Sequence, residues 1–201
     1  MTISKVLNQI DNDLPDSLER LFELLRIQSI STDPAYKDEC QKAADWLVSD
    51  LNSIGFNASK RETPGHPMVI GHSEGAGPHI MFYGHYDVQP ADPLELWSNP
   101  PFEPIIEDTK KGKVIRARGA SDDKGQLMTF VEACRAWQKV NGQLPVKVSI
   151  FFEGEEESGS PSLVPFMKKN ANELTADIAL ICDTGLYGEE TPAIITMLRG
   201  I

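Results

Sequence analysis

Residues 146–157 read VKVSIFFEGEEE, an apolar run that changes abruptly into an acidic one. Val146–Phe152 is dense in β-branched and aromatic side chains, as expected of a strand buried on both faces. Similar apolar runs occur at Ile178–Cys182 and Ala193–Leu198, and a moderate helical pattern over Ser160–Asn172 separates the first two. Strands that alternate with helices of this length predict an α/β fold with a mostly parallel central sheet flanked by helices.

Two helices are predicted before the first strand. Leucines recur at helical spacing over Leu18–Leu25, with Asp16 as a candidate cap at the start. Apolar residues over Cys40–Leu51 fall on one helical face, and Gly55 closes the segment. A third helix is predicted directly after residues 122–125.

Short extended runs and loops fill the region between these helices. The runs are Met68–Ile70, His79–Tyr83 and Val114–Ala117. The glycine-rich segment between the first two matches no phosphate-binding pattern, so we interpret it as a plain turn. Pro90–Pro104 is rich in proline and acidic residues and is predicted to be a loop, anchored by Trp97 and Phe102.

Composition excludes several classes of protein. The net charge of −11 over 201 residues disfavours nucleic-acid or anionic-membrane partners, which select basic surfaces. No run approaches the roughly 20 apolar residues of a membrane span, and Met1–Asp11 lacks the features of a secretory signal. The three cysteines are far apart and lie in apolar patterns, which favours reduced thiols and a cytoplasmic location.

Histidine and acidic residues gather where the predicted strands end. Four groups follow apolar strands: Gly84–Val88, Arg118–Gly125, Glu153–Ser160 and Asp183. Ligands of open α/β sheets bind outside the carboxyl ends of the strands, so the four groups are expected to converge. Each group alone has a structural interpretation, such as a histidine–carboxylate pair or a solvated acidic loop. Their joint occurrence in this order makes coincidence a poor explanation.

Converging carboxylates predict a metal site. They repel one another in a partly dry cleft unless protons or multivalent cations offset the repulsion. One imidazole with several carboxylates suits zinc, manganese or a similar first-row ion. Cys182 precedes Asp183, but neighbours on a strand point to opposite faces, and we favour the aspartate as the ligand.

The same residues resemble the co-catalytic zinc metallopeptidases, which include carnosinase-type dipeptidases, glutamate carboxypeptidase, aminoacylase, acetylornithine deacetylase and succinyl-diaminopimelate desuccinylase. The matching stretches are YGHYDVQP at 83–90, WSNPPF at 97–102, RGASDDKG at 118–125 and EEESGS at 155–160, followed by Asp183 and by Arg199 and Gly200. The sequence motifs around His85 and Glu156 resemble the dipeptidase branch more than the deacylases. The resemblance implies a catalytic domain of the zinc-peptidase type.

The resemblance also implies a ligand set for two divalent ions, with zinc favoured and manganese or cobalt as alternatives. His85 and Asp183 would bind one ion, Glu157 the other, and Asp122 would bridge them. Asp87 would orient the imidazole of His85 from behind, as carboxylates commonly do for metal-binding histidines.

Catalysis in this family uses a glutamate as general base, which corresponds to Glu156. It would deprotonate a water held between the metals. The peptide after the bridging aspartate is typically cis in the family, so Asp122–Asp123 is the corresponding bond here.

The family pattern includes features that these residues do not supply. A further metal-binding histidine comes from far downstream, whereas His66, His72 and His79 match no family motif. The resemblance therefore implies that residues 1–201 are the N-terminal part of the catalytic domain. The lid and dimerisation domain, through which the intact protein is expected to form a homodimer, and the C-terminal part of the catalytic domain would be absent. Such a chain is expected to hold one ion or none and to be inactive alone.

The implied function is metal-dependent hydrolysis of amide bonds, with dipeptides as the leading substrate class. An N-acyl-amino-acid deacylase or a carboxypeptidase of the same family is the alternative, with a small N-acyl amino acid as the substrate of the former. A non-catalytic interaction module is an alternative of a different class.

Overall fold

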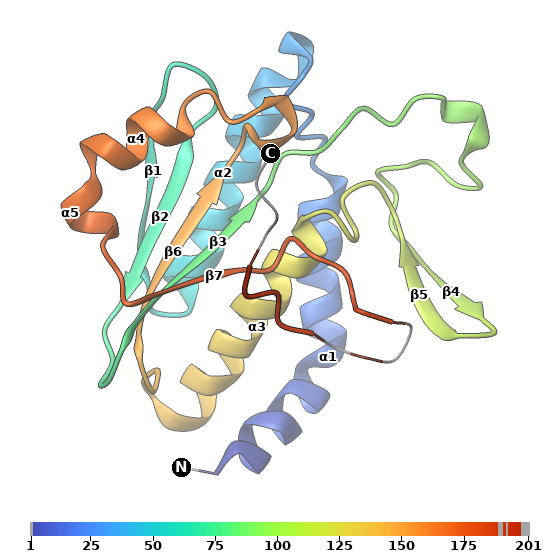
Figure 1. Cartoon of the computed structure of the whole chain (residues 1–201). Coiled ribbons are helices and arrows are strands. Elements are labelled where there is room, and N and C mark those ends of the chain that lie inside the picture. The colour runs from blue at the N-terminus through green and yellow to red at the C-terminus, as the bar shows by residue number, and fades with distance from the viewer. Residues whose placement is uncertain (1, 189–190, 192, 198–201) are drawn as a thin grey trace.

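The central sheet confirms the predicted fold class. The computed structural model describes residues 2–188, 191 and 193–197 (Figure 1). The sheet consists of β1 (Asn57–Arg61), β2 (Met68–Ser73), β3 (His79–His85), β6 (Lys147–Glu153) and β7 (Ile178–Ile181), in the order β1-β2-β6-β3-β7. β3 pairs in parallel with β6 and β7, whereas β2 pairs antiparallel with β1 and β6. Four strands therefore run in one direction, and β2 runs in the other.

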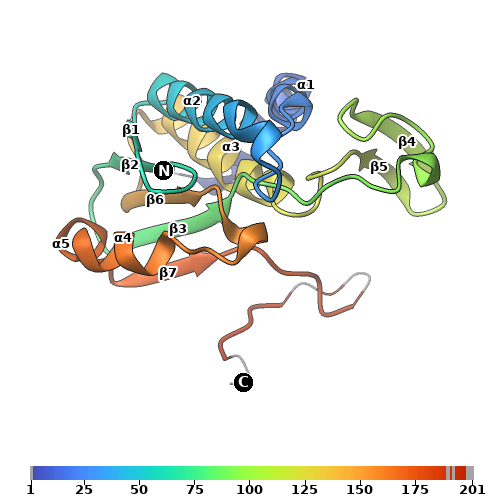
Figure 2. The ribbon, with the colours of Figure 1, turned by 90° about the horizontal axis from the view of Figure 1, so that it is seen from above.

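Helices cover both faces of this sheet. The helices are α1 (Ile3–Arg26), α2 (Lys37–Ser53), α3 (Lys124–Asn141), α4 (Leu163–Lys169) and α5 (Ala171–Leu174). Figure 2 shows α1, α2 and α3 on one face and α4 and α5 on the other. Ile150 of β6 packs into the core under the first three helices, and Phe151 packs into the smaller core that includes Leu174. This two-sided burial explains why the strand reads as a continuous apolar run.

Helix α1 is longer than predicted. It begins at Ile3 and continues through Pro15, so Asp16 lies inside the helix and is not its cap. The extension contacts α3, where Lys139 Nζ lies 2.8 Å from an Asp13 carboxylate oxygen and the Ser17 hydroxyl donates to Glu132 at 2.8 Å. The extension also has its own apolar pattern, which the prediction left out, because Ile3, Val6, Leu7, Ile10 and Leu14 fall on one helical face.

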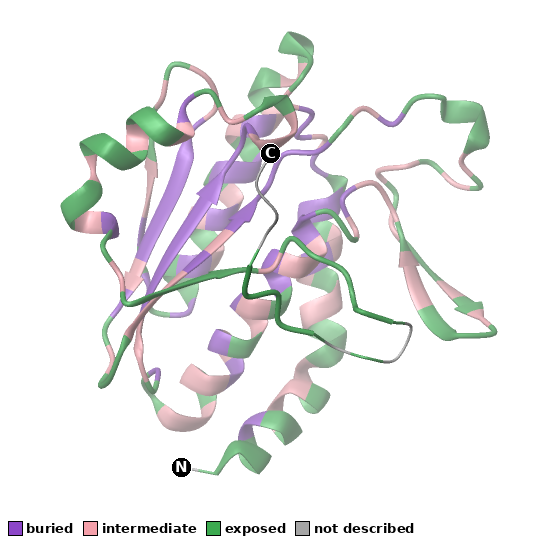
Figure 3. Ribbon diagram, in the orientation of Figure 1, coloured by how far each residue is buried: buried purple, intermediate pink, exposed green. Residues whose placement is uncertain are grey.

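The predictions for the last two strands and the second-face helix need correction. β7 forms as expected, but its four residues are exposed and not buried on both faces (Figure 3). Among the described residues it pairs with β3 alone, so it lies at the edge of the sheet. Residues 193–197 form no strand, and Leu198 lies outside the described residues. The single helix predicted over 160–172 is two short helices, α4 and α5, separated at Asn170.

The strand predicted at Val114–Ala117 lies outside the central sheet. It belongs to β5 (Gly112–Arg116), which pairs with β4 (Ile105–Thr109) in a separate antiparallel hairpin at the side of the molecule (Figure 1). The segment after β5 therefore returns to the sheet through the start of α3, so Asp122 approaches the strand ends from the N-terminus of that helix.

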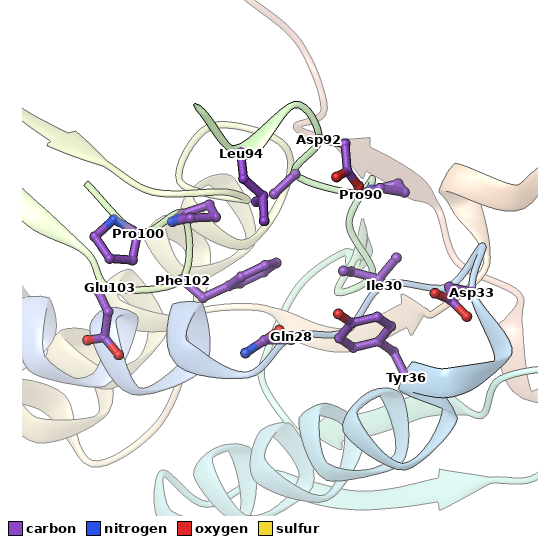
Figure 4. A pocket seen from close by; sticks show the side chains of 12 residues that line it. Gln28, Ile30, Asp33, Tyr36, Pro90, Asp92, Leu94, Pro100, Phe102 and Glu103 are labelled. Atoms are coloured by element: carbon purple, nitrogen blue, oxygen red, sulfur yellow. The ribbon is translucent and has the colours of Figure 1, made fainter. Parts of the chain in front are cut away.

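Trp97 holds the loop over Pro90–Pro104, and the anchoring role of Phe102 stays a prediction. Trp97 Nε1 donates to the carbonyl of Ala91 at 2.7 Å, and its ring lies under the Arg118 guanidinium. Phe102 lines a cavity of about 390 Å³, where Figure 4 shows its ring near that of Tyr36. No helix of the described residues is long and apolar enough to cross a membrane.

Candidate metal centre

His85 is the central residue of the candidate site. It is the last residue of β3, its side chain is fully buried, and both ring nitrogens face acceptors. Nδ1 lies 3.1 Å from the carbonyl oxygen of Asp87 and 3.3 Å from Oδ1 of the same residue. Nε2 points away from Asp87 and toward carboxylates from three other segments of the chain.

Three carboxylates surround Nε2 of His85. Asp122 Oδ1 lies at 3.0 Å, Asp183 Oδ2 at 3.6 Å and Glu156 Oε2 at 3.9 Å. They come from the start of α3, the residues after β7 and the turn after β6, respectively. His85, Glu156 and Asp183 each offer a ligand atom within 4.8 Å of the other two. The expected convergence is thus present, although Asp122 reaches the site from outside the sheet.

Asp183 faces the site as predicted, although β7 ends at Ile181, so Cys182 and Asp183 lie just beyond the strand and its alternation does not explain their orientation. Its carboxylate faces His85, whereas Cys182 is partly buried and packs against the main hydrophobic core. The aspartate thus faces the imidazole, and the thiol contributes to packing.

Asp87 connects the histidine to the acidic turn. Its side chain is fully buried, and its carboxylate accepts hydrogen bonds from the backbone N–H groups of Glu156 at 3.2 Å and Glu157 at 3.0 Å. The Ser31 hydroxyl donates a third bond at 2.5 Å. One carboxylate therefore fixes the turn after β6 as well as lying beside the His85 ring.

The Glu157 side chain contacts Gln89 rather than the His85 imidazole. Its carboxylate oxygen Oε2 accepts a hydrogen bond from Gln89 Nε2 at 2.8 Å, and the same amide lies 3.2 Å from the carbonyl of Glu157. Glu156, which the resemblance assigns as the base, is the neighbour that approaches His85. The structure thus brings all six predicted residues together, and their individual roles stay predictions.

Asp122 is joined to Asp123 by a cis peptide bond, as the resemblance predicted. Asp123 is almost fully buried, and its Oδ2 accepts the backbone N–H of His85 at 3.0 Å. This contact fastens the start of α3 to the end of β3, so that Asp122 is held beside the imidazole.

The electrostatic environment favours a cation at His85. Burial lowers the pKa of the imidazole, but the hydrogen bond to Asp87 and the charges of Asp87, Asp123 and Glu156 outweigh it and raise the pKa to about 10. In the metal-free chain a proton on His85 thus partly compensates the surrounding negative charge.

The donor set fits a divalent first-row metal ion. Imidazole nitrogen and carboxylate oxygen are the ligand types that zinc and manganese share, and the buried His85 ring already has a carboxylate behind it, as metal-binding histidines usually do. Three carboxylates within 4 Å of one imidazole nitrogen also supply the negative charge that such an ion requires.

Three residues around the centre were not assigned from the sequence. Asp123 and Gln89 lie inside the quoted motifs, so the sequence indicated that they are near the site, but it did not indicate which atoms they contact. Ser31 is 56 residues from Asp87 and belongs to no motif, so nothing in the sequence indicated it.

Comparisons with known proteins extend the match beyond these residues. The chain is 30% identical over its whole length to the Cys-Gly metallodipeptidase dug1 of Schizosaccharomyces pombe, of which it covers 44%. Its structure is similar to that of the dipeptidase Dug1p from Saccharomyces cerevisiae, with a TM-score of 0.84 and 29% identity over 93% of this chain and 42% of that one. Human carnosine dipeptidase 1 gives a TM-score of 0.82 at 25% identity, over 92% of this chain and 41% of that one.

These relatives are more than twice as long as the region they share with this chain, which spans about 44% of the length of the curated dipeptidases of this kind. The profile of peptidase family M20/M25/M40 matches residues 81–195, more than half of the chain, and this region contains all six predicted site residues. The chain belongs to peptidase family M20/M25/M40.

Proposed function

We propose that this protein hydrolyses dipeptides with the help of divalent metal ions bound at the carboxyl ends of β3, β6 and β7. The observation that carries the proposal is the buried His85, whose Nε2 faces carboxylates from three distant segments. Metallodipeptidases among the relatives support dipeptides as the substrate class, with cysteinylglycine as a first candidate.

Membership of this metallopeptidase family implies divalent metal ions. We propose two ions, with zinc favoured and manganese or cobalt as alternatives. His85, Asp122 and Asp183 would hold one, and Asp122 and Glu157 would contribute to the other. When bound, such ions polarise a scissile carbonyl and make a water molecule more acidic.

Glu156 is proposed as the general base. Burial raises the pKa of its carboxyl, the charge of His85 opposes this rise, and the carboxylates of Glu157 and Asp183 add to it. A carboxylate with a raised pKa is a better base, and it can accept a proton from the attacking water and pass it to the leaving amine. Its side chain is 39% exposed, so water and substrate can reach it.

Asp87 is proposed to act through its neighbours. It holds the His85 ring on one side and the backbone of Glu156 and Glu157 on the other. The same buried carboxylate thereby holds both the imidazole of His85 and the backbone of the proposed base. The resemblance implies that such a carboxylate raises the basicity of the histidine ligand.

The test is made on the intact protein, of which residues 1–201 are proposed to be the N-terminal part, and it combines metal analysis with hydrolysis of cysteinylglycine, β-alanyl-histidine, an N-acetyl amino acid and a longer peptide. We expect the dipeptides to be cleaved only with metal present, and Glu156→Gln to abolish turnover while metal content stays near that of the wild type. The matched control is Glu95→Gln, an exposed acid outside the site. Metal binding without cleavage of any substrate would favour an interaction module, whereas preference for the N-acetyl amino acid would favour the deacylase alternative.

Three further assignments stay predictions. These are the placement of residues 1–201 in the N-terminal part of a catalytic domain, the homodimer and the cytoplasmic location.

A further inference from the structure

The acidic run after β6 divides into two pairs with different environments. Glu153 and Glu155 are almost fully buried, at 0% and 3% exposure, whereas Glu156 and Glu157 are partly exposed at the candidate metal centre. The function proposed above uses only the second pair. A buried carboxylate is costly unless it is hydrogen-bonded or paired, so the first pair needs its own explanation.

Glu155 is explained by backbone contacts. Its two carboxylate oxygens accept the N–H groups of His66 and Ser162, both at 3.1 Å. These bonds attach the loop before β2 and the start of α4 to the acidic run.

Glu153 makes a different set of contacts. Its Oε1 accepts hydrogen bonds from the hydroxyl groups of Tyr83, on β3, and Ser160, which lies 3.0 Å away at the end of the acidic turn. Oε2 is buried and has no hydrogen-bond partner among the described residues. The carboxyl therefore joins two segments through a single oxygen atom.

The position of Glu153 in the sheet places these contacts beside the site. It is the register partner of His85 in the parallel pairing of β3 and β6, and its carbonyl accepts the N–H of Tyr86 at 2.9 Å. The end of the strand that carries the central histidine and the start of the turn that carries Glu156 are thus linked at the same level of the sheet.

Ser160 shows how the far end of the turn is held. It has a positive φ of 52°, which few residues other than glycine adopt. Two hydrogen bonds support this conformation: the N–H of Ser160 donates to the backbone carbonyl of Glu155 at 2.7 Å, and its hydroxyl donates to the Glu153 carboxylate. Such a backbone conformation persists where the surroundings determine it.

The turn is therefore fixed at both ends. Asp87 binds the N–H groups of Glu156 and Glu157 at its start, and Glu153 binds the hydroxyl of Ser160 at its close. Between these points the chain forms a single 3₁₀ turn, Glu156–Ser158.

We propose that Glu153 is a positioning residue, which holds the turn over residues 156–160 through Ser160 and Tyr83 and so presents Glu156 and Glu157 to the metal centre. The inference rests on the proposed function for the role of those two carboxylates. The hydrogen bonds of Glu153 require only an acceptor oxygen, so a glutamine can replace it, whereas a leucine of similar size cannot.

The experiment compares Glu153→Leu with Glu153→Gln in this chain by hydrogen–deuterium exchange and by Co²⁺ titration. For Glu153→Leu we expect faster amide exchange over residues 156–160, an altered visible spectrum of bound Co²⁺ and an affinity at least about tenfold lower, as for other residues that orient metal ligands. Glu153→Gln is expected to restore all three readouts, because its carbonyl oxygen can accept both hydroxyl groups.

The control is Glu132→Leu. Glu132 is a partly buried acid on α3 that accepts the Ser17 hydroxyl and pairs with Arg20, so its loss lowers overall stability at a distance from the turn. It should leave exchange over residues 156–160 and the Co²⁺ spectrum unchanged. Equal effects of the two leucine variants on these readouts would show general destabilisation and overturn the proposal.

Milder variants cover the case in which Glu153→Leu does not fold. Ser160→Ala and Tyr83→Phe each remove one hydroxyl donor, and each is expected to speed exchange over residues 156–160. Unchanged exchange in both would overturn the proposal. If the wild-type chain binds no Co²⁺, the proposed function is decided by the test on the intact protein, and the exchange comparison decides the role of Glu153.

Discussion

Replacing Asp87 by alanine tests whether one carboxylate organises the candidate centre. The side chain is fully buried and accepts hydrogen bonds from Ser31, from the N–H of Glu156 and from the N–H of Glu157. Asp87→Ala leaves these three donors without an acceptor. At about 1 kcal/mol each, the low end of the usual range because the donors are only half-buried, the cost is about 3 kcal/mol of unfolding free energy.

Urea and thermal unfolding with EDTA present measure this cost without a contribution from metal. For a chain of this size the expected fall in Tm is about 6–12 °C. Asp33→Ala is the matched control, because Asp33 is exposed and its carboxylate accepts a bond from the N–H of Ala35 in a short 3₁₀ turn. It is expected to cost at most about 1 kcal/mol.

Metal binding provides the second measurement for Asp87→Ala. The His85 ring loses the carboxylate 3.3 Å from its Nδ1, and the turn that carries Glu156 loses its anchor. We therefore expect Co²⁺ affinity to fall by about 10–100-fold. A stability loss below about 1 kcal/mol together with unchanged Co²⁺ affinity would refute the reasoning.

Three further predictions concern other parts of the site and its support. Asp122→Ala is expected to lose bound metal, measured by elemental analysis, because it removes the carboxylate 3.0 Å from the His85 imidazole; retention of wild-type metal content would contradict its role as a ligand. The pKa of His85 is raised to about 10, so an ion must displace a proton at lower pH. Apparent Co²⁺ affinity should therefore increase about tenfold per pH unit from pH 6.5 to 8, with release of about one proton in calorimetry, and a flat profile would count against His85 as a ligand. Lys124→Met should cost about 1–3 kcal/mol in urea unfolding, because the fully buried Nζ donates to the carbonyl of Ile27 at 2.7 Å, whereas the Leu24 carbonyl at 3.1 Å also accepts the N–H of Ile27; no loss of stability would show that the Ile27 carbonyl finds another partner.

The sequence determined the fold class and the composition of the site. Buried strands produce continuous apolar runs, and the acidic groups that follow them lie at strand ends because the chain must leave the sheet there. His85, Glu156 and Asp183 were identifiable for this reason, whereas the alternation argument that favoured Asp183 over Cys182 does not apply, because both residues follow the end of β7 at Ile181. These sequence patterns are local, so they can be recognised without knowing which segments pack against them.

The tertiary structure decided how these residues are supported. Lys139 pairs with Asp13 between α3 and the N-terminal half of α1. β7 lies beside β3, and its side chains are exposed although its sequence is apolar, so the apolar run alone did not determine burial. The strand before Asp122 pairs in a separate hairpin, which no periodicity within it could reveal.

Burial within the acidic run depended on the same long-range arrangement. Asp87 bonds to Ser31, 56 residues away, and Glu153 bonds to Tyr83, 70 residues away, because sheet register and loop packing bring these atoms together. The sequence shows four glutamates within five residues; only the folded chain separates the buried pair, Glu153 and Glu155, from the partly exposed pair, Glu156 and Glu157, at the candidate metal centre.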